Sequence, residues 1–324
     1  MMLSVFNRFF SRKGTSKQVS LGVEIAPQGL GVALVSAKGK GVPTVNVCEF
    51  KPCAPGGWGE ALKEFCKAQS LKNVKTYVAF HPEFYDLMLI DAPEVPDEEL
   101  RDAVKWRVKD FASGDIEDYV VDAFRLPEDA YRGRMNMIYA AYMKKEAVIP
   151  IVELCEELEL DLVEIGVSEL ARARIAAGRE ELTDLGVAFL HMEEKKGQID
   201  LIENGCLYLT RGIDTGYGML NQGESEGELS LDNSSQFDSL ALDIQRSLDY
   251  YESQLGKSGI SKLWIVTAEP LSKEACESLS EKLPVQVEAF DICVHFNCEQ
   301  GCSGFMDSCS VAVGATLGGD DVAA

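Results

Sequence analysis

The sequence predicts a two-lobed α/β protein in which the first lobe carries an insert. A strand-strand-strand-helix-strand order occurs twice, a different block of strands and helices separates the two copies, and the 324 residues suffice for about two domains. A hydrophobic fraction of 46% and a charged fraction of 26% are ordinary for a globular chain, so they exclude a disordered or fibrous one. A duplicated unit of this kind predicts a cleft between two lobes.

The first copy is defined by short apolar runs separated by turn residues. Strands are expected over 19–26, 30–35 and 42–50, with Gly and Pro in the connections. A helix over 58–68 and a strand over 74–80 complete this copy. The helix is predicted from apolar residues at helical spacing, which are Trp58, Ala61, Leu62, Phe65 and Cys66.

The block that follows has the β-α-β-β-α-β order of a ferredoxin-like insert, at about 82–167. Asp97 is expected to cap its first helix. The stripe of that helix expected to be buried consists of Leu100, Val104, Val108 and Phe111.

The second copy repeats the plan with strands over 187–192, 198–203 and 207–213 and a long helix over 236–255. Alternating strands and helices follow, and the last helix is expected over 308–317. The predicted division is a basic tail at 1–18, a first lobe with its insert at 19–178 and a second lobe at 179–324.

Charge and cysteine usage limit the possible function classes. The net charge of −22 disfavours a nucleic-acid partner, because an acidic surface repels phosphate backbones. The basic residues of the tail permit two interpretations: residues 1–17 lie on an anionic membrane surface, or they form an ordinary flexible tail. No apolar run approaches the ~20 residues of a membrane span, and the ten cysteines fit reduced thiols of a cytoplasmic protein.

Several segments, in the right order, resemble the PilM group of pilus-assembly proteins, which have the actin-like ATPase (ribonuclease H-like) fold. Gly22 to Ala26 lies where that family has its first phosphate-loop strand. Residues 95–106 resemble its "P-E-E-E-L-R-x-A-I-x-W" helix start, and residues 209–213 resemble the strand that carries "T-R". Residues 243–251 resemble its "I-x-R-S-L-D-F-Y" helix, and the whole chain most resembles the MshI branch, which serves the mannose-sensitive haemagglutinin (MSHA) pilus.

The resemblance implies a cytoplasmic scaffold, peripheral to the inner membrane, that serves a type IV pilus machine. Its implied partners are the N-terminal tail of a PilN-like bitopic inner-membrane protein and the pilus assembly platform and motor, to which the scaffold links that protein. The implied peptide groove lies between the first lobe and the insert, near Arg101 and Trp106. A basic tail approaching an acidic protein would also be steered electrostatically.

The resemblance also implies a nucleotide cleft, but its loops are degenerate in this chain. The cofactor-binding candidates are Glu24, Gln28, Gly29 and Gly31, around a first turn in which Pro27 has no N–H to offer a phosphate. The second turn contains Glu193 and Glu194, which would repel a triphosphate, and the third, at 267–270, lacks its glycines. We therefore expect no catalysis and no cofactor; the alternative is an active protein that binds ATP with Mg²⁺ and is gated by nucleotide.

The remaining signals have plain structural interpretations. Cys293, His295, Cys298, Cys302 and Cys309 are either small core residues or a metal site; the lack of a C-x-x-C pair favours the core and no metal. His81 and His191 stand alone at strand ends and are interpreted as structural. Gly256 is expected to end a helix, and the acidic stretch 221–235 is expected to be a loop of unassigned role.

Overall fold

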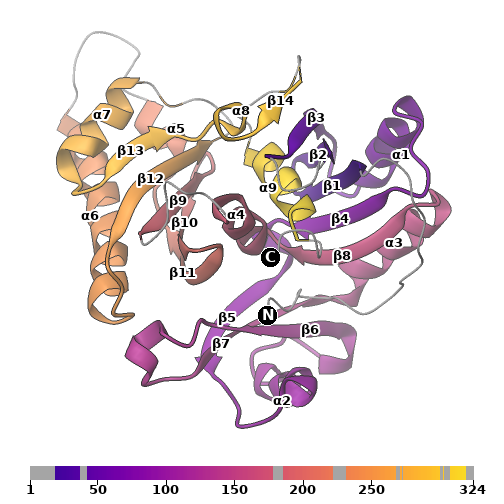
Figure 1. Ribbon diagram of the computed structural model, residues 1–324, viewed down its shortest axis with the longest axis horizontal. Helices are drawn as coiled ribbons and strands as arrows, with labels where there is room; N and C mark the ends of the chain where they lie inside the picture. The colour runs from indigo at the N-terminus through magenta and orange to yellow at the C-terminus, as the bar shows by residue number, and fades with distance from the viewer. Residues whose placement is uncertain are drawn as a thin grey trace.

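The computed structural model describes residues 19–36, 42–177, 185–221, 231–267, 271, 273–299, 302 and 307–318. It contains three sheets, of six, five and three strands (Figure 1). The predicted tail, the third turn beyond Thr267 and most of the acidic stretch lie outside the described residues. No helix of the described segments has the length and apolar character that crossing a membrane requires.

The first lobe is built on the six-stranded sheet, in the order β14-β3-β2-β1-β4-β8. Its early strands form the expected antiparallel meander, and β4 then runs parallel to β1. The helix packs Leu62, Phe65 and Cys66 into the core. These elements are β1 (Val19–Ala26), β2 (Gly29–Ser36), β3 (Thr44–Pro52), α1 (Trp58–Ala68) and β4 (Lys75–Phe80).

The insert is a three-stranded sheet, ordered β5-β7-β6, with one helix on its outer face (Figure 1). Leu100, Val104 and Val108 of that helix are buried as expected. Phe111 is instead 61% exposed, because the helix ends at Val108 and no longer holds the side chain on the buried stripe. The elements are β5 (Asp86–Asp91), α2 (Asp97–Val108), β6 (Tyr119–Arg125) and β7 (Met137–Lys144).

The fourth strand expected in the insert belongs to the first lobe instead. After α3 (Lys145–Glu157), β8 (Asp161–Val167) pairs in parallel with β4, so the insert lacks the complete ferredoxin-like sheet. The buried Ile165 and Val167 of β8 are part of the large core, where α3 gives the parallel strand the cover it needs. The order of elements is the predicted one; only the pairing differs.

The second lobe repeats the first. Its sheet has the order β11-β10-β9-β12-β13, which matches β3-β2-β1-β4-β8 position by position. The long helix buries Leu240, Ile244, Leu248 and Tyr251, as its spacing predicts. The elements are β9 (Gly186–Met192), β10 (Gly197–Glu203), β11 (Cys206–Ile213), α5 (Tyr217–Asn221), α6 (Leu231–Ser253), β12 (Ile260–Thr267), α7 (Lys273–Lys282) and β13 (Gln286–Ala289).

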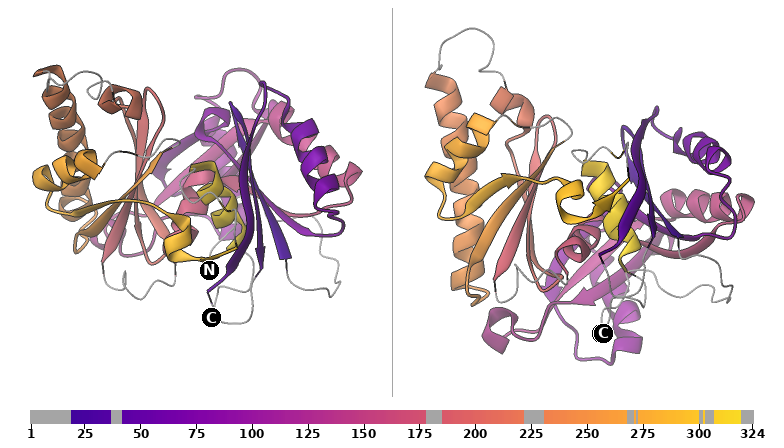
Figure 2. Two further views of the ribbon diagram at one scale, coloured as in Figure 1. Left: turned by 90° about the horizontal axis from the view of Figure 1, so that it is seen from above. Right: turned by 45° about the horizontal axis from the view of Figure 1, so that its top comes forward.

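The chain then returns to the first lobe, which corrects the expectation that residues 179–324 form the second lobe alone. After α8 (Ile292–His295), the two-residue β14 (Asn297–Cys298) pairs with β3. α9 (Asp307–Thr316) and α4 (Ser168–Ala176) lie between the two large sheets (Figure 2). Gly22 and Gly314 allow this packing: a Cβ on Gly22 would lie 1.8 Å from the carbonyl oxygen of Ala312. The sequence pattern predicted the helix α9 but not the lobe that it covers.

The insert is tied to the second lobe as well as to the first. The connection between β6 and β7 contributes Asp129, whose carboxylate accepts hydrogen bonds from Lys257 and Tyr208. Lys257 also forms an ion pair with Glu203 at 2.8 Å and is almost fully buried. Gly256, just before it, has a φ of +76° but lies three residues beyond Ser253, where α6 ends, so it follows the helix end rather than forming it.

Candidate functional site

The first hairpin turn, between β1 and β2, offers little to a phosphate. Ala26 pairs with Gly29, so only Pro27 and Gln28 form the turn, and Pro27 has no N–H. Gln28 is exposed, but its carbonyl accepts a hydrogen bond from the N–H of Cys53 at 3.1 Å, which ties the turn to the end of β3. The turn therefore serves strand pairing.

The other residues proposed for this loop are buried within the sheet. Glu24 has no exposed surface and lies opposite Gly31 in the β1–β2 register. A Cβ on Gly29 would approach the carbonyl oxygen of Lys51 to 2.4 Å, so glycine is needed there for close packing of β3. The structure thus brings Glu24 and Gly31 together, with Gln28 and Gly29 at the adjacent turn.

The second hairpin turn, Glu193 to Lys196 between β9 and β10, is closed by its own backbone. The N–H of Glu193 donates to the carbonyl of Lys196 at 2.9 Å. The N–H groups of Tyr217 and Gly218 donate to the carbonyls of Glu193 and Glu194, at 2.8 and 3.0 Å. A phosphate cradle needs backbone N–H groups aimed at the ligand, whereas this turn uses its carbonyls to hold the start of α5.

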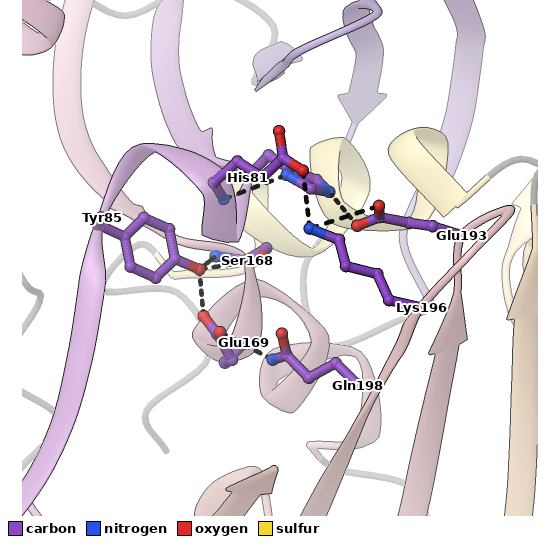
Figure 3. A network of polar contacts seen from close by, with 8 residues as sticks. His81, Tyr85, Ser168, Glu169, Glu193, Lys196 and Gln198 are labelled. Carbon is purple, nitrogen blue, oxygen red and sulfur yellow. Dashed lines mark hydrogen bonds and ion pairs between the residues drawn. The ribbon is translucent and has the colours of Figure 1, made fainter. Parts of the chain in front are cut away.

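Side chains from the two lobes meet at this turn (Figure 3). His81, at the end of β4, donates from Nε2 to Oε1 of Glu193 at 3.1 Å. Lys196 donates from Nζ to Oε1 of Glu83 at 2.7 Å and lies 3.7 Å from Glu193. An ion pair between Lys196 and Glu83 and a hydrogen bond from His81 to Glu193 therefore connect the first lobe to the second.

A second polar network, more deeply buried, lies beneath these contacts (Figure 3). The Tyr85 hydroxyl donates to the Glu169 carboxylate and accepts from the N–H of Ser168 at 3.2 Å. Gln198 of β10 donates to the other Glu169 oxygen at 2.8 Å. The Ser168 hydroxyl is also hydrogen-bonded to the Tyr85 hydroxyl at 3.1 Å, and α4 begins at Ser168.

The electrostatics of the two layers differ because one is more deeply buried. Burial, followed by the nearby charge of Asp200, raises the pKa of Glu169. Burial also acts to raise the pKa of Glu193, but the hydrogen bond from His81 and the charge of Lys196 outweigh it and lower that pKa overall. The upper layer is therefore held by an ionised carboxylate.

His81, His191 and Glu193 place potential metal-ligand atoms within 4.8 Å of one another, the one such group found in the part of the chain that the structure describes. The N–H of Glu83 donates to Nδ1 of His81 at 3.3 Å, so Nε2 carries the proton that it gives to Glu193. In that state Nε2 has no lone pair for a metal. The arrangement fits an ion-pair and hydrogen-bond network better than a metal centre.

Sequence reasoning missed this network because it considered the two histidines separately. They lie on different lobes, more than a hundred residues apart in the chain, yet their rings are 5.9 Å apart in an edge contact. The available signal was that each lies at or just after the C-terminal end of a strand, β4 or β9, although the two strands occupy different places in the duplicated unit.

The two residues proposed for a partner groove do not share a face. Arg101 donates to Asp122 of β6 at 3.2 Å, whereas Trp106 is 71% exposed with Lys109 5.4 Å above its ring. Five positions on an α-helix separate side chains by about 140° around the axis. The exposed Trp106 ring and the Arg101 side chain, which is held at β6, therefore lie on different sides of α2.

Comparison with solved structures identifies the fold. A PilM–PilN complex of type IV pilus biogenesis aligns with a TM-score of 0.68 and 18% identity, over 93% of this chain and 98% of the other. The fold is PilM-like. No family model and no curated protein matches the sequence.

Two other solved structures resemble this PilM-like chain more distantly. The cytoplasmic domain of EpsL, an inner-membrane component of the Vibrio cholerae type II secretion system, has a TM-score of 0.46 and 13% identity, over 82% of this chain and 94% of that one. A Bacteroides thetaiotaomicron protein described as having an actin-like ATPase fold has a TM-score of 0.48 and 12% identity, over 84% and 91%.

Proposed function

We propose that the protein is a cytoplasmic scaffold of a type IV pilus assembly machine of the MSHA kind. It binds the N-terminal cytoplasmic tail of a PilN-like bitopic inner-membrane protein and links it to the assembly platform and motor. The support is the likeness to a PilM chain in complex with PilN, which extends over nearly the whole of both chains. The net charge of −22 would steer a basic tail toward this surface.

The scaffold works without nucleotide hydrolysis. The observation that carries this part is the pair of cross-lobe contacts, Glu83 with Lys196 and His81 with Glu193, at the turn where the fold would hold phosphates. A triphosphate would have to displace these contacts and approach two carboxylates, and both steps cost free energy. A phosphate cradle does the opposite, because it stabilises the charge of the phosphates. The protein would also lie at the inner membrane through its tail, residues 1–17, whose bases outnumber its acids.

A Mg-ATP titration tests the absence of nucleotide function. We expect no binding heat and no shift in unfolding temperature at millimolar ATP. A ligand present at 100 times its Kd would stabilise the folded protein by about 2.7 kcal/mol, which is easily measured. Stoichiometric binding would favour the alternative, in which Lys196 releases Glu83 to hold phosphate and nucleotide gates the partner.

A peptide titration tests the partner. The probe is a fluorescent peptide with the sequence of the cytoplasmic tail of the PilN-like protein from the same source, and binding should weaken as salt increases. Of the two candidate residues, Trp106 is free to contact a peptide, so Trp106→Ala should weaken binding about tenfold or more if it anchors the tail. Leu242→Ala, a half-exposed apolar residue on α6, is the matched control. No binding by the unaltered protein would refute the partner assignment.

A further inference from the structure

The connection between β6 and β7 reaches from the insert to the second lobe. In Figure 1 it lies beneath β11 and the end of α6. Asp129 accepts hydrogen bonds there from Tyr208 and Lys257, and the Tyr131 hydroxyl is hydrogen-bonded to the Tyr250 hydroxyl of α6 at 2.9 Å. We call residues 129–133 the strap.

The backbone of the strap is strained. Tyr131 and Arg132 have φ of +55° and +56° with ψ of 28° and 34°, and Gly133 follows with a φ of +66°. Glycine adopts this left-handed conformation readily, whereas a residue with a Cβ meets a steric penalty there. No other two neighbouring non-glycine residues in the described segments share a positive φ. Such a pair persists only where its surroundings hold it.

The insert contacts the same edge of the second lobe at another point. Tyr139 of β7 is 2% exposed, and its hydroxyl accepts a hydrogen bond from the N–H of Thr210 on β11 at 3.1 Å. β11 is the last of the described strands on this side of its sheet. Tyr208, which donates to Asp129, lies two residues earlier on the same strand. The N–H of Thr210 therefore reports whether the insert is in place against β11.

The charged partner of the strap on the second lobe keeps other contacts when the strap leaves. The Lys257 side chain is 8% exposed, forms an ion pair with Glu203 at 2.8 Å and lies 4.6 Å from the centre of the Tyr208 ring. The Asp129 side chain is 59% exposed, so water can hydrate its carboxylate. Release of the strap therefore leaves no buried charge without a partner, which is the usual large cost of breaking a buried ion pair.

We propose that residues 129–133 are a releasable strap that couples the insert to the second lobe. The chain itself joins the insert only to the first lobe, through β4 at one end and α3 at the other. When the strap is closed, a movement of the insert is transmitted to β11 and α6. When it is open, the insert moves with the first lobe alone. The strained backbone and the retained contacts of Lys257 both favour opening. This device does not depend on the proposed function.

Amide hydrogen exchange of the full chain, measured by mass spectrometry, tests the strap. One peptide covers residues 127–136, in which the N–H of Arg134 donates to the carbonyl of Tyr131 at 3.1 Å, and a second covers 207–213 with the N–H of Thr210. Tyr131→Phe removes the hydroxyl contact with α6 and should speed exchange in both peptides by about 2–10-fold. Asp129→Asn is a second strap variant with the same expectation.

Tyr119→Phe is the matched control, because the Tyr119 hydroxyl donates to the carbonyl of Ser113 within the insert, away from the strap. It should leave exchange in both peptides unchanged, and near-ultraviolet circular dichroism checks that every variant folds. Faster exchange at 127–136 with unchanged exchange at 207–213 would overturn the proposal, because the strap would then open without freeing the insert from β11. Unchanged exchange in both peptides of both strap variants would also overturn it.

A pair of glycine substitutions tests the strain. Arg132 and Arg134 are both exposed, but Arg132 has a φ of +56° and Arg134 has a φ of −92°. Glycine relieves strain only at position 132, so the strap peptide should exchange more slowly in Arg132→Gly than in Arg134→Gly, by about fivefold or more. The rates are corrected for the intrinsic exchange of each sequence. Equal corrected rates would refute the part of the proposal that rests on strain.

Discussion

Arg172 of α4 is fully buried and donates from Nε to Oδ2 of Asp200 on β10, at 2.7 Å. It is the deepest charged contact described between α4 and the second lobe. Both side chains have no exposed surface, so each charge depends on the other for compensation. Asp200 also accepts from Gln198 at 3.0 Å, which joins the pair to the Tyr85–Glu169 network.

Arg172→Met should therefore destabilise the protein by about 3–5 kcal/mol, because it leaves a buried carboxylate without its partner. Urea unfolding measures this loss. Lys273→Ala on α7 is the control, since its ion pair with Glu277 is largely exposed and should contribute less than about 1 kcal/mol. Equal effects of the two substitutions would contradict the argument.

Glu193 gives the cleft a defined pH dependence. Its pKa in the folded protein lies below the ordinary value of 4.5, so the folded state binds this proton less tightly than the unfolded state does. The stability that the ionised carboxylate contributes is present above that ordinary value and is lost as pH falls through the lowered pKa. Unfolding temperatures of the unaltered protein and of Glu193→Gln, measured across the acid range, should therefore converge as the pH falls.

Glu194→Gln is the control for this measurement, because Glu194 lies in the same hairpin turn and is exposed. Its pH profile should follow that of the unaltered protein. The interpretation fails if Glu193→Gln keeps the full acid dependence of the unaltered protein.

At the scale of elements, the close packing of α9 against β1 and α4 depends on glycines, which have no side chain. A Cβ at position 22 would overlap the carbonyl of Ala312, and one at Gly314 would lie 2.1 Å from the carbonyl of Ala171 on α4. Glycine is required here for close approach rather than for an unusual backbone angle. The helix between the sheets is thus positioned by contacts of backbone against backbone.

Gly22→Ala should push α9 outward and cost about 1–3 kcal/mol, the usual range for overpacking. Gly212→Ala on β11 is the matched control, because a Cβ there meets nothing within 4 Å. Chemical unfolding measures the free energy of unfolding of both variants and so tests this difference. A Gly22→Ala protein as stable as the control would mean that α9 moves without cost.

At the scale of the whole molecule, the two lobes are held together in different ways at different depths. The Arg172 pair is buried, whereas Lys196 and Glu83 have side chains that are 50% and 44% exposed. The outer contacts are therefore screened by water and salt. They therefore join the two lobes less strongly than the buried Arg172–Asp200 pair does.

A double-mutant cycle with Glu83→Gln and Lys196→Met should accordingly give a coupling energy of about 0.2–1 kcal/mol that decreases with added salt. Lys195→Met replaces Lys196→Met in the control cycle, since Lys195 is exposed in the same turn. A coupling energy above about 2 kcal/mol, or an equal one in the control cycle, would show that the cleft is closed by another mechanism.

Local sequence patterns predicted the helices and strands well, because each pattern depends on residues that are close together in the chain. The spacing of Leu240, Ile244 and Leu248 predicted the buried face of α6, and it is buried. The missing N–H of Pro27 and the acids of the second turn predicted degenerate phosphate loops, and this stays a prediction; in the structure, both turns use their backbone for other contacts. The prediction that Phe111 is buried was wrong, because it applied helical spacing to a residue beyond Val108, where the helix ends.

By itself, the sequence determined the type and order of nearly every element, the duplicated plan and the PilM-like fold. Only the tertiary structure decided which sheet β8 joins, where β14 and α9 return, and that His81 meets His191. The physical reason is that helix and strand periodicity reports burial between neighbours in the chain. Pairing between distant segments depends on which surfaces remain uncovered once the lobes have formed.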